Sequence, residues 1–199
     1  MEIKGIAINC PYWMNKIRSG EIVRGYGNGK ADAKAIKEKL EETFDSSDLY
    51  KFAKRVRTGI DCSGFVYRVL NFLVPQLNKI FPGSINKTNA ARLTNIKDAV
   101  LITQLDNIKP GDMIRMRSGK HVAVIIEKNE KNIIYAHSTS SRYTANQGVH
   151  LGEIEIVDSS ISLEKQIWKE KLKGKGSFKL LYFRPEKGDG VYRLKWMNS

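Results

Sequence analysis

Cys62 is the residue in this sequence best placed for nucleophilic chemistry. It lies in residues 59–70, where a short polar turn leads directly into an apolar repeat at helical spacing. Asp61 and Ser63 are good capping residues, so we expect a helix to begin close to Cys62. A thiol there lies in the positive field of the helix N-terminus, beside unpaired backbone N–H groups, and both favour the thiolate. The alternative is a small buried thiol with a packing role, which is common for free cysteines.

Two of the three histidines are candidate partners for this thiol. His121 opens one apolar run and His137 ends the next, across a turn short enough for a hairpin. On neighbouring antiparallel strands two such side chains can lie close on one face. One imidazole would take the thiol proton and return it to the leaving amine, while the other would fix its tautomer. Backbone N–H groups at the helix start, including that of Cys62, would donate to the oxyanion.

The remaining histidine and cysteine are weaker candidates. We expect His150 at the surface or in the substrate groove rather than in the third catalytic role. Cys10 lies 52 positions before Cys62, which gives no disulfide framework, and a disulfide between the two would silence the nucleophile. No pair of cysteine or histidine candidates has metal-ligand spacing, so the sequence implies no metal and no organic cofactor.

The elements predicted around these residues give an α+β fold. Apolar residues recur at helical spacing before Pro75 and alternate after Pro110, which favours helices followed by a meander of strands. We therefore expect the helix that carries the nucleophile to pack on an antiparallel sheet. Residues 1–58 would form a helical extension packed on a catalytic domain of residues 59–199, as one compact unit. Helices are predicted at 31–44, 47–56, from Cys62 to about Pro75, 89–94 and 162–172, extended segments at 100–105, Met113–Met116, 121–127, 133–137, 149–157, 178–183 and 191–196, and irregular structure at 1–28.

The composition limits the partners of the protein. A formal net charge of +13 favours polyanions such as nucleic acid, an anionic membrane surface or an anionic cell wall. The lysines are spread along the chain, so the sequence does not locate a binding site for such a polyanion. The sequence shows no secretory signal and no apolar run long enough for a membrane span. We therefore expect a cytoplasmic protein, with a released lysin or a truncated secreted protein as the alternatives.

Four short motifs in order resemble the NlpC-like family of bacterial papain-fold cysteine peptidases. They are Asp-Cys-Ser-Gly-Phe-Val at 61–66, Lys-Pro-Gly-Asp-Met-Ile at 109–114, His-Val-Ala-Val at 121–124 and Tyr-Ala-His-Ser at 135–138. The resemblance covers about half of the chain. It implies a papain-like fold with Cys62 as nucleophile, His121 as general base and His137 as orienting member. It also implies that Asp61 and Ser63 contribute to a substrate amine site.

The family typically hydrolyses the amide between D-glutamate and a diamino acid in peptidoglycan stem peptides. Stem peptides or peptidoglycan fragments are thus the partners that the resemblance implies. Two departures stand out, because the family's Tyr-x-x-Gly-Gly stretch is missing and its His-Ala order appears as Ala136-His137. A shift of one residue flips a strand side chain to the other face, so a local bulge is needed for His137 to face His121.

The function predicted from the sequence is thus amide hydrolysis in the cell wall by a Cys-His-His triad through an acyl-enzyme. One alternative keeps the fold and the residues but makes the protein an acyltransferase, or an amidase on a substrate outside the cell wall. A distant alternative is a basic module without enzymatic activity that binds nucleic acid; scattered charge and the absence of a binding motif disfavour it.

Overall fold

The computed structural model describes part of the chain, and the candidate site lies within that part. The described residues are 17–18, 21–22, 60–74, 77, 88–139, 144, 148–174 and 176–198. The predicted helices at 31–44 and 47–56, and with them most of the predicted N-terminal extension, lie outside these residues. None of the helices described has the length and apolarity needed to cross a bilayer.

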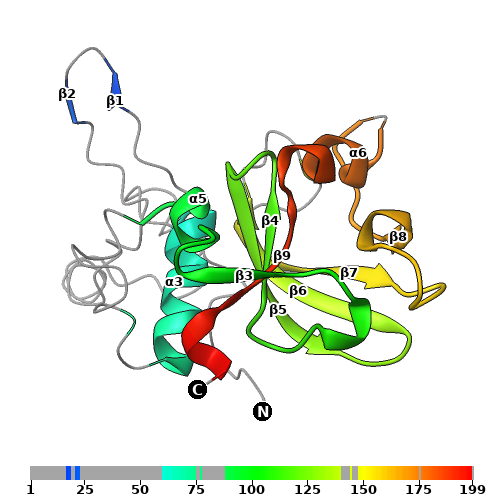
Figure 1. The fold of residues 1–199 in the computed structure, drawn as a ribbon. Coiled ribbons are helices and arrows are strands. Elements are labelled where there is room, and N and C mark those ends of the chain that lie inside the picture. The colour runs from blue at the N-terminus through cyan, green and yellow to red at the C-terminus, as the bar shows by residue number, and fades with distance from the viewer. Residues whose placement is uncertain are drawn as a thin grey trace, which may run out of the picture.

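Seven antiparallel strands form the main sheet, in the order β3-β9-β4-β5-β6-β7-β8 (Figure 1). The last strand in sequence, β9, lies between β3 and β4, while β4 to β7 follow one another as a meander. The strands are β3 (Ala99–Ile102), β4 (Met113–Met116), β5 (His121–Lys128), β6 (Asn132–Thr139), β7 (Gly148–Glu155), β8 (Ile167–Trp168) and β9 (Gly190–Leu194). The sequence predicts all of them except β8.

Helices cover both faces of this sheet (Figure 1). The helices α3 (Cys62–Leu73) and α5 (Ala90–Leu93) lie on one face, and α6 (Phe178–Tyr182) lies on the other. Short 3-10 turns complete the described elements, namely η4 (Leu105–Asn107), η5 (Leu163–Lys165), η6 (Pro185–Lys187) and η7 (Lys195–Asn198). The observed architecture is therefore the predicted α+β one, with the Cys62 helix packed on an antiparallel sheet.

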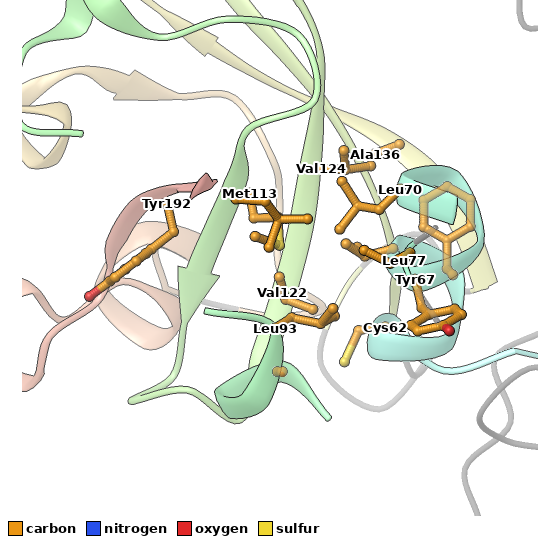
Figure 2. Close-up of a cluster of buried hydrophobic side chains, with 14 of the residues drawn as sticks. Cys62, Tyr67, Leu70, Leu77, Leu93, Met113, Val122, Val124, Ala136 and Tyr192 are labelled. Carbon is orange, nitrogen blue, oxygen red and sulfur yellow. The ribbon is translucent and has the colours of Figure 1, made fainter. Parts of the chain in front are cut away.

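The sequence around Cys62 accounts for both ends of α3. Asp61 is the N-cap, and its carboxylate accepts the backbone N–H of Gly64 at 2.7 Å, which satisfies one of the free donors of the first turn. The helix ends at Leu73, two residues before Pro75 in the sequence. Between these ends the apolar side chains of α3 pack on Val122 and Val124 of β5 (Figure 2). This packing holds Cys62 beside the strand that carries His121.

Three sequence predictions are wrong. The strand predicted at 178–183 is replaced by α6, because Phe178 and Tyr182 lie four residues apart and bury one face of a helix. The helix predicted at 162–172 is replaced by η5 and β8. There the buried Gln166 amide donates to three backbone carbonyls of its own loop, which competes with helix formation. Two-residue strands β1 (Ile17–Arg18) and β2 (Glu21–Ile22) pair where irregular structure is predicted, since such short strands have no alternation to detect.

A buried ion pair fixes the turn that leads into β4. Asp112 follows Gly111, whose φ of +94° favours glycine, and accepts the backbone N–H of Lys109 at 2.8 Å. The same carboxylate accepts from the guanidinium of Arg193 in β9 at 2.7 and 2.9 Å. Asp112 therefore shapes its turn and ties it to the neighbouring strand.

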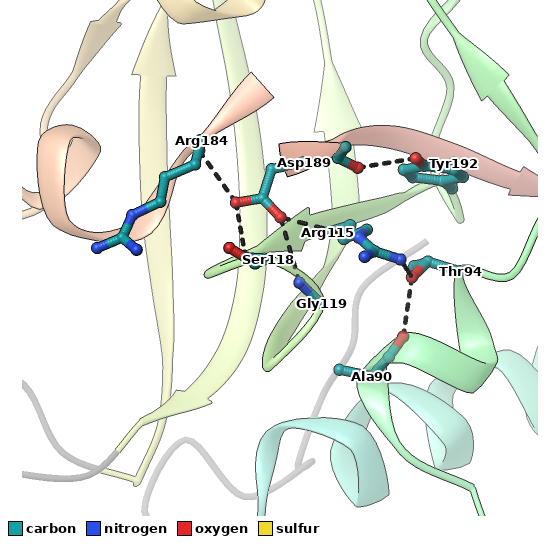
Figure 3. Close-up of polar contacts among 9 residues, drawn as sticks. Ala90, Thr94, Arg115, Ser118, Gly119, Arg184, Asp189 and Tyr192 are labelled. Atoms are coloured by element: carbon teal, nitrogen blue, oxygen red, sulfur yellow. Dashed lines mark hydrogen bonds and ion pairs between the residues drawn. The ribbon is translucent and has the colours of Figure 1, made fainter. Parts of the chain in front are cut away.

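A second carboxylate holds the turn immediately before His121. Asp189 accepts the backbone N–H groups of Ser118 and Gly119 at 3.0 and 3.3 Å, and that of Arg184 at 3.0 Å (Figure 3). Residues 117 and 118 have positive φ values of 54° and 58°, a conformation that costs energy for residues other than glycine. The contacts from Asp189 offset this strain and fix the start of β5.

We expect Asp112→Ala to lower the free energy of unfolding by about 3–5 kcal/mol, because it leaves the buried Arg193 guanidinium without its counter-ion. Urea denaturation of the full chain measures this change. Asp106→Ala is the matched control, since Asp106 is exposed and forms an ion pair with Lys128 at 3.8 Å, and it should cost less than about 1 kcal/mol. Equal losses in the two variants would show that the Asp112–Arg193 pair has no special role.

Candidate active site

Cys62 is a free, buried thiol at the first residue of α3. Its sulfur receives backbone hydrogen bonds from Val122, the neighbour of His121 in sequence, and from the first N–H groups of α3. Even so, burial and the adjacent Asp61 raise the pKa of the thiol to about 12. The expectation that the helix start favours the thiolate is therefore wrong for the resting protein, because burial outweighs the hydrogen bonds.

A β-bulge decides which face of the sheet His121 and His137 share. Near the hairpin turn Lys128 pairs with Ile133, and an unbroken ladder from there would pair Val124 with His137 and leave His121 on the opposite face. The register instead shifts between Ile125 and Glu127, so that Val124 pairs with Ala136. This shift brings His121 and His137 to the same face, as the sequence order requires.

The two imidazoles are joined by a direct hydrogen bond. His121 Nε2 lies 2.8 Å from His137 Nδ1, and both rings are buried. On the far side of His137, Nε2 lies 2.9 Å from Oε2 of Glu170, out of line with the ring N–H. A carboxylate only accepts, which assigns a proton to His137 Nε2 and makes Nδ1 the acceptor for His121 Nε2–H. His121 Nδ1 is then the unprotonated nitrogen of the pair.

Glu170 extends the histidine pair into a larger buried cluster. Its Oε1 lies 3.0 Å from His150 Nε2, and its Oε2 accepts the hydroxyl of Tyr135 at 2.8 Å. His150 is the direct cross-strand partner of His137, with ring centroids 4.4 Å apart. His150 is buried instead of lying at the surface or in a groove, which corrects that expectation.

Burial and the carboxylate together set the charges in this cluster. Burial holds the pKa of His121 well below its usual range and lowers that of His137, so both rings are neutral. Burial alone would raise the pKa of Glu170, but the imidazoles of His137 and His150 hold it below its usual range, and Glu170 stays ionised. The cluster thus contains one buried negative charge surrounded by hydrogen-bond donors.

Aromatic rings of α6 close the site on this face of the sheet. Tyr182 packs edge-on against His121 with centroids 5.3 Å apart, and Phe178 packs edge-on against His137 at 5.9 Å. The two aromatic rings stack on each other at 4.3 Å. They exclude water from the histidine pair, which explains why the imidazoles resist protonation.

Asp61 and Ser63 flank the thiol and contact each other. The Ser63 hydroxyl donates to the Asp61 carboxylate at 3.1 Å, and both residues are buried. Their observed contacts belong to the helix cap. Their role in binding a substrate amine stays a prediction.

Glu170 is the residue of this site that the sequence patterns do not reveal. It follows β8, in the segment predicted as a helix, and lies in none of the four motifs. Residues 167–170 read Ile-Trp-Lys-Glu, with no alternation of apolar and polar residues, so the sequence offers no local signal for Glu170.

Comparisons of the chain with protein-family models, with curated proteins and with solved structures each found no match. Membership of the NlpC-like family is therefore a proposal, which depends on the four motifs and on the geometry of the site.

We expect the protein to lose stability as the pH falls below about 6.5, the ordinary pKa of histidine. His121 and His137 have lowered pKa values in the folded protein, so unfolding takes up protons below that pH. Each such histidine contributes a slope of at most about 1.4 kcal/mol per pH unit. Urea denaturation between pH 5 and 8 should show a shallower slope for His121→Gln than for the wild type. Identical slopes would mean that His121 is not held neutral by folding.

Proposed function

We propose that the protein is a cysteine peptidase of the NlpC-like family that hydrolyses an amide bond in peptidoglycan stem peptides. The observation that supports this best is the His121–His137 hydrogen bond of 2.8 Å, at the start of the strand whose Val122 N–H contacts the Cys62 sulfur. Cysteine nucleophiles use a thiol and an imidazole that a second polar group orients. Here Cys62 lies beside the strand that carries His121, while the His121 ring itself packs against Tyr182 of α6.

The resting site is a neutral thiol and a neutral imidazole, because burial shifts their pKa values in opposite directions. Cys62 therefore attacks the substrate carbonyl as His121 removes its proton, in general-base catalysis without a preformed ion pair. His121 Nδ1 is the nitrogen that receives this proton. The sulfur forms a bond to the carbonyl carbon, and His121 then protonates the leaving amine. In the second half of the reaction, His121 removes a proton from water, the water attacks the acyl carbon, and the Cys62 thiol leaves with the proton returned by His121.

Glu170 stabilises the imidazolium that forms during this reaction. When His121 gains a proton, positive charge develops next to His137, whose other nitrogen faces the Glu170 carboxylate. A buried negative charge at that position favours the charged state over the resting one. Glu170 acts through His137, so it is a positioning residue of the site.

The same helix start supplies donors for the oxyanion. The backbone N–H groups of Cys62 and Ser63 lie at the first turn of α3 and contact the sulfur in the resting state. When the sulfur bonds to carbon, these groups become available to the developing oxyanion.

The basic composition agrees with an anionic wall as the substrate surface. Asp61 and Ser63 would hold a free substrate amine, as the family resemblance implies. Transfer of the acyl group to an amine instead of water is the second candidate function, because the same residues would perform it. Cytoplasmic recycling of wall fragments and action as a released lysin both fit this chemistry.

We expect wild-type protein, incubated with defined stem peptides, to release a fragment that begins at the diamino acid, detected by mass spectrometry. Cys62→Ala should abolish release, because no other group described at the site can form the acyl-enzyme. Cys10→Ala is the matched thiol control and should retain activity. Products carrying an added amine in place of water would favour acyl transfer, and release by Cys62→Ala would refute the mechanism.

We expect Glu170→Gln to lower kcat about 10²-fold, within the range that positioned proton transfer contributes, with little change in KM. The amide keeps the shape of the side chain but removes the charge that stabilises the imidazolium. The pH profile of kcat should also shift, which a loss of packing alone would not cause. Glu153→Gln, a charge-matched change outside the cluster, should leave kcat within about twofold of the wild type. Equal kcat values for the two variants would show that Glu170 has no role in the mechanism.

A further inference from the structure

Three side chains of the buried cluster point their ligating atoms at one another. His137, His150 and Glu170 each offer one ligand atom, and these atoms all lie within 4.8 Å of one another. The carboxylate is bracketed by the two imidazoles, at 2.9 Å from His137 Nε2 and 3.0 Å from His150 Nε2. All three side chains are nearly inaccessible to solvent, with exposed fractions of 0%, 9% and 3%.

The hydrogen bonds of the cluster are incomplete while both imidazoles are neutral. His150 Nδ1 lies 3.0 Å from the carbonyl oxygen of Gly148, while its Nε2 faces the Glu170 carboxylate. Both partners only accept, and a neutral imidazole has a single N–H to donate. His137 Nε2 is fully buried and has no aligned hydrogen-bond partner. A cation between the nitrogens and the carboxylate would satisfy all three groups with neutral rings.

The surroundings also match those of a metal site. Imidazoles that bind metals usually donate their other N–H to a carbonyl or another polar group, and carboxylate ligands are usually hydrogen-bonded in turn. Here His150 Nδ1 faces Gly148 O, His137 Nδ1 faces His121 Nε2, and the Tyr135 hydroxyl donates to Glu170. The supporting shell is therefore already in place.

We propose that His137 Nε2, His150 Nε2 and the Glu170 carboxylate bind a zinc ion. Two histidines, one glutamate and a water in the fourth position form a set that tetrahedral zinc accepts. Bonds of about 2.0–2.2 Å put such ligand atoms about 3.3 Å apart, so shifts on the order of 1 Å would close the site. Imidazole ligands favour zinc and other late transition metals over magnesium or calcium.

A surface hollow lies next to the cluster. This hollow, of about 520 Å³, is lined by Gly152 and Glu170 among others. Gly152 is the cross-strand partner of Tyr135 and packs against its ring, since a Cβ added there would come within 2.4 Å of the Tyr135 hydroxyl. Glu170 therefore belongs both to the cluster and to the wall of the hollow.

Zinc at this site would inhibit the hydrolysis, a consequence that rests on the proposed function. With Nε2 bound to the metal, the proton of His137 moves to Nδ1, which then donates to His121 Nε2. Neutral His121 must in turn carry its proton on Nδ1, the nitrogen that would accept the Cys62 proton. Metal binding and proton transfer from Cys62 thus require opposite tautomers of the same pair.

Zinc titration of the full-length protein by calorimetry, after removal of metals with a chelator, tests the proposal. We expect one zinc ion per chain in both the wild type and Cys62→Ala, since the thiol is not a ligand. His150→Ala and Glu170→Gln should each weaken binding more than about 100-fold, and Tyr135→Phe about 10- to 100-fold. Glu153→Gln, which changes the hollow but not the cluster, should bind zinc like the wild type.

The visible spectrum of the cobalt-substituted protein and the ¹⁵N NMR spectrum of the histidine side chains provide independent checks. The cobalt form should show the visible bands of a tetrahedral site without the charge-transfer band of a thiolate ligand. In the wild type, zinc should shift the ¹⁵N resonances of His137 and His150 Nε2, a readout that needs no variant to fold. No zinc binding, unchanged Nε2 resonances, or a thiolate band that Cys62→Ala abolishes would overturn the proposal. Because these readouts do not depend on peptide hydrolysis, failure of the proposed function would leave them intact.

Discussion

The register between β5 and β6 is the constraint on which the candidate site depends. One extra residue in β5, between Ile125 and Glu127, shifts the pairing of β5 with β6. Without this shift, His121 would lie on the α3 face of the sheet and His137 on the opposite face. With it, both rings lie on the face that α6 covers, and the direct β6–β7 pairing adds His150 to them. Because side chains alternate along a strand, a single backbone irregularity decides whether the polar cluster exists.

Burial has opposite consequences for the parts of this cluster. It keeps Cys62, His121 and His137 neutral, because the nearby hydrogen bonds and the Glu170 carboxylate compensate only in part for the lost hydration. Glu170 keeps its charge because imidazoles and a tyrosine hydroxyl surround it. One fixed negative charge beside neutral imidazoles would suit the proposed reaction, because it stabilises positive charge only when that charge forms. Removal of any one side chain should destabilise the cluster, because it leaves the remaining buried polar groups without their hydrogen-bond partners.

Local patterns predict much of this fold, and long-range contacts account for the failures. The helix start at Asp61, the turn at Asp112 and the strands from Met113 onward are predictable, because capping, turn chemistry and alternation act over a few residues. The order of the residue types also brings out Cys62, His121 and His137 as candidates. Glu170 is not predictable in this way, since it meets His137 across 33 positions and follows a two-residue strand. The pKa of Cys62 was mispredicted for a related reason, because the helix start is visible in the sequence but its burial depends on tertiary packing.

The position of β9 has a consequence for the order of assembly. This strand is the last in the sequence, yet it fills the gap between β3 and β4, and Asp189 just before it holds the strained turn that precedes His121. During synthesis, a chain that has not yet supplied residues 189–194 therefore has a β4 paired with β5 alone, a β3 without its partner strand, and a turn before His121 that lacks its contacts with Asp189. The turn that positions His121 is therefore fully supported only once residues 189–194 have been synthesised, although Cys62 and its helix come much earlier in the chain.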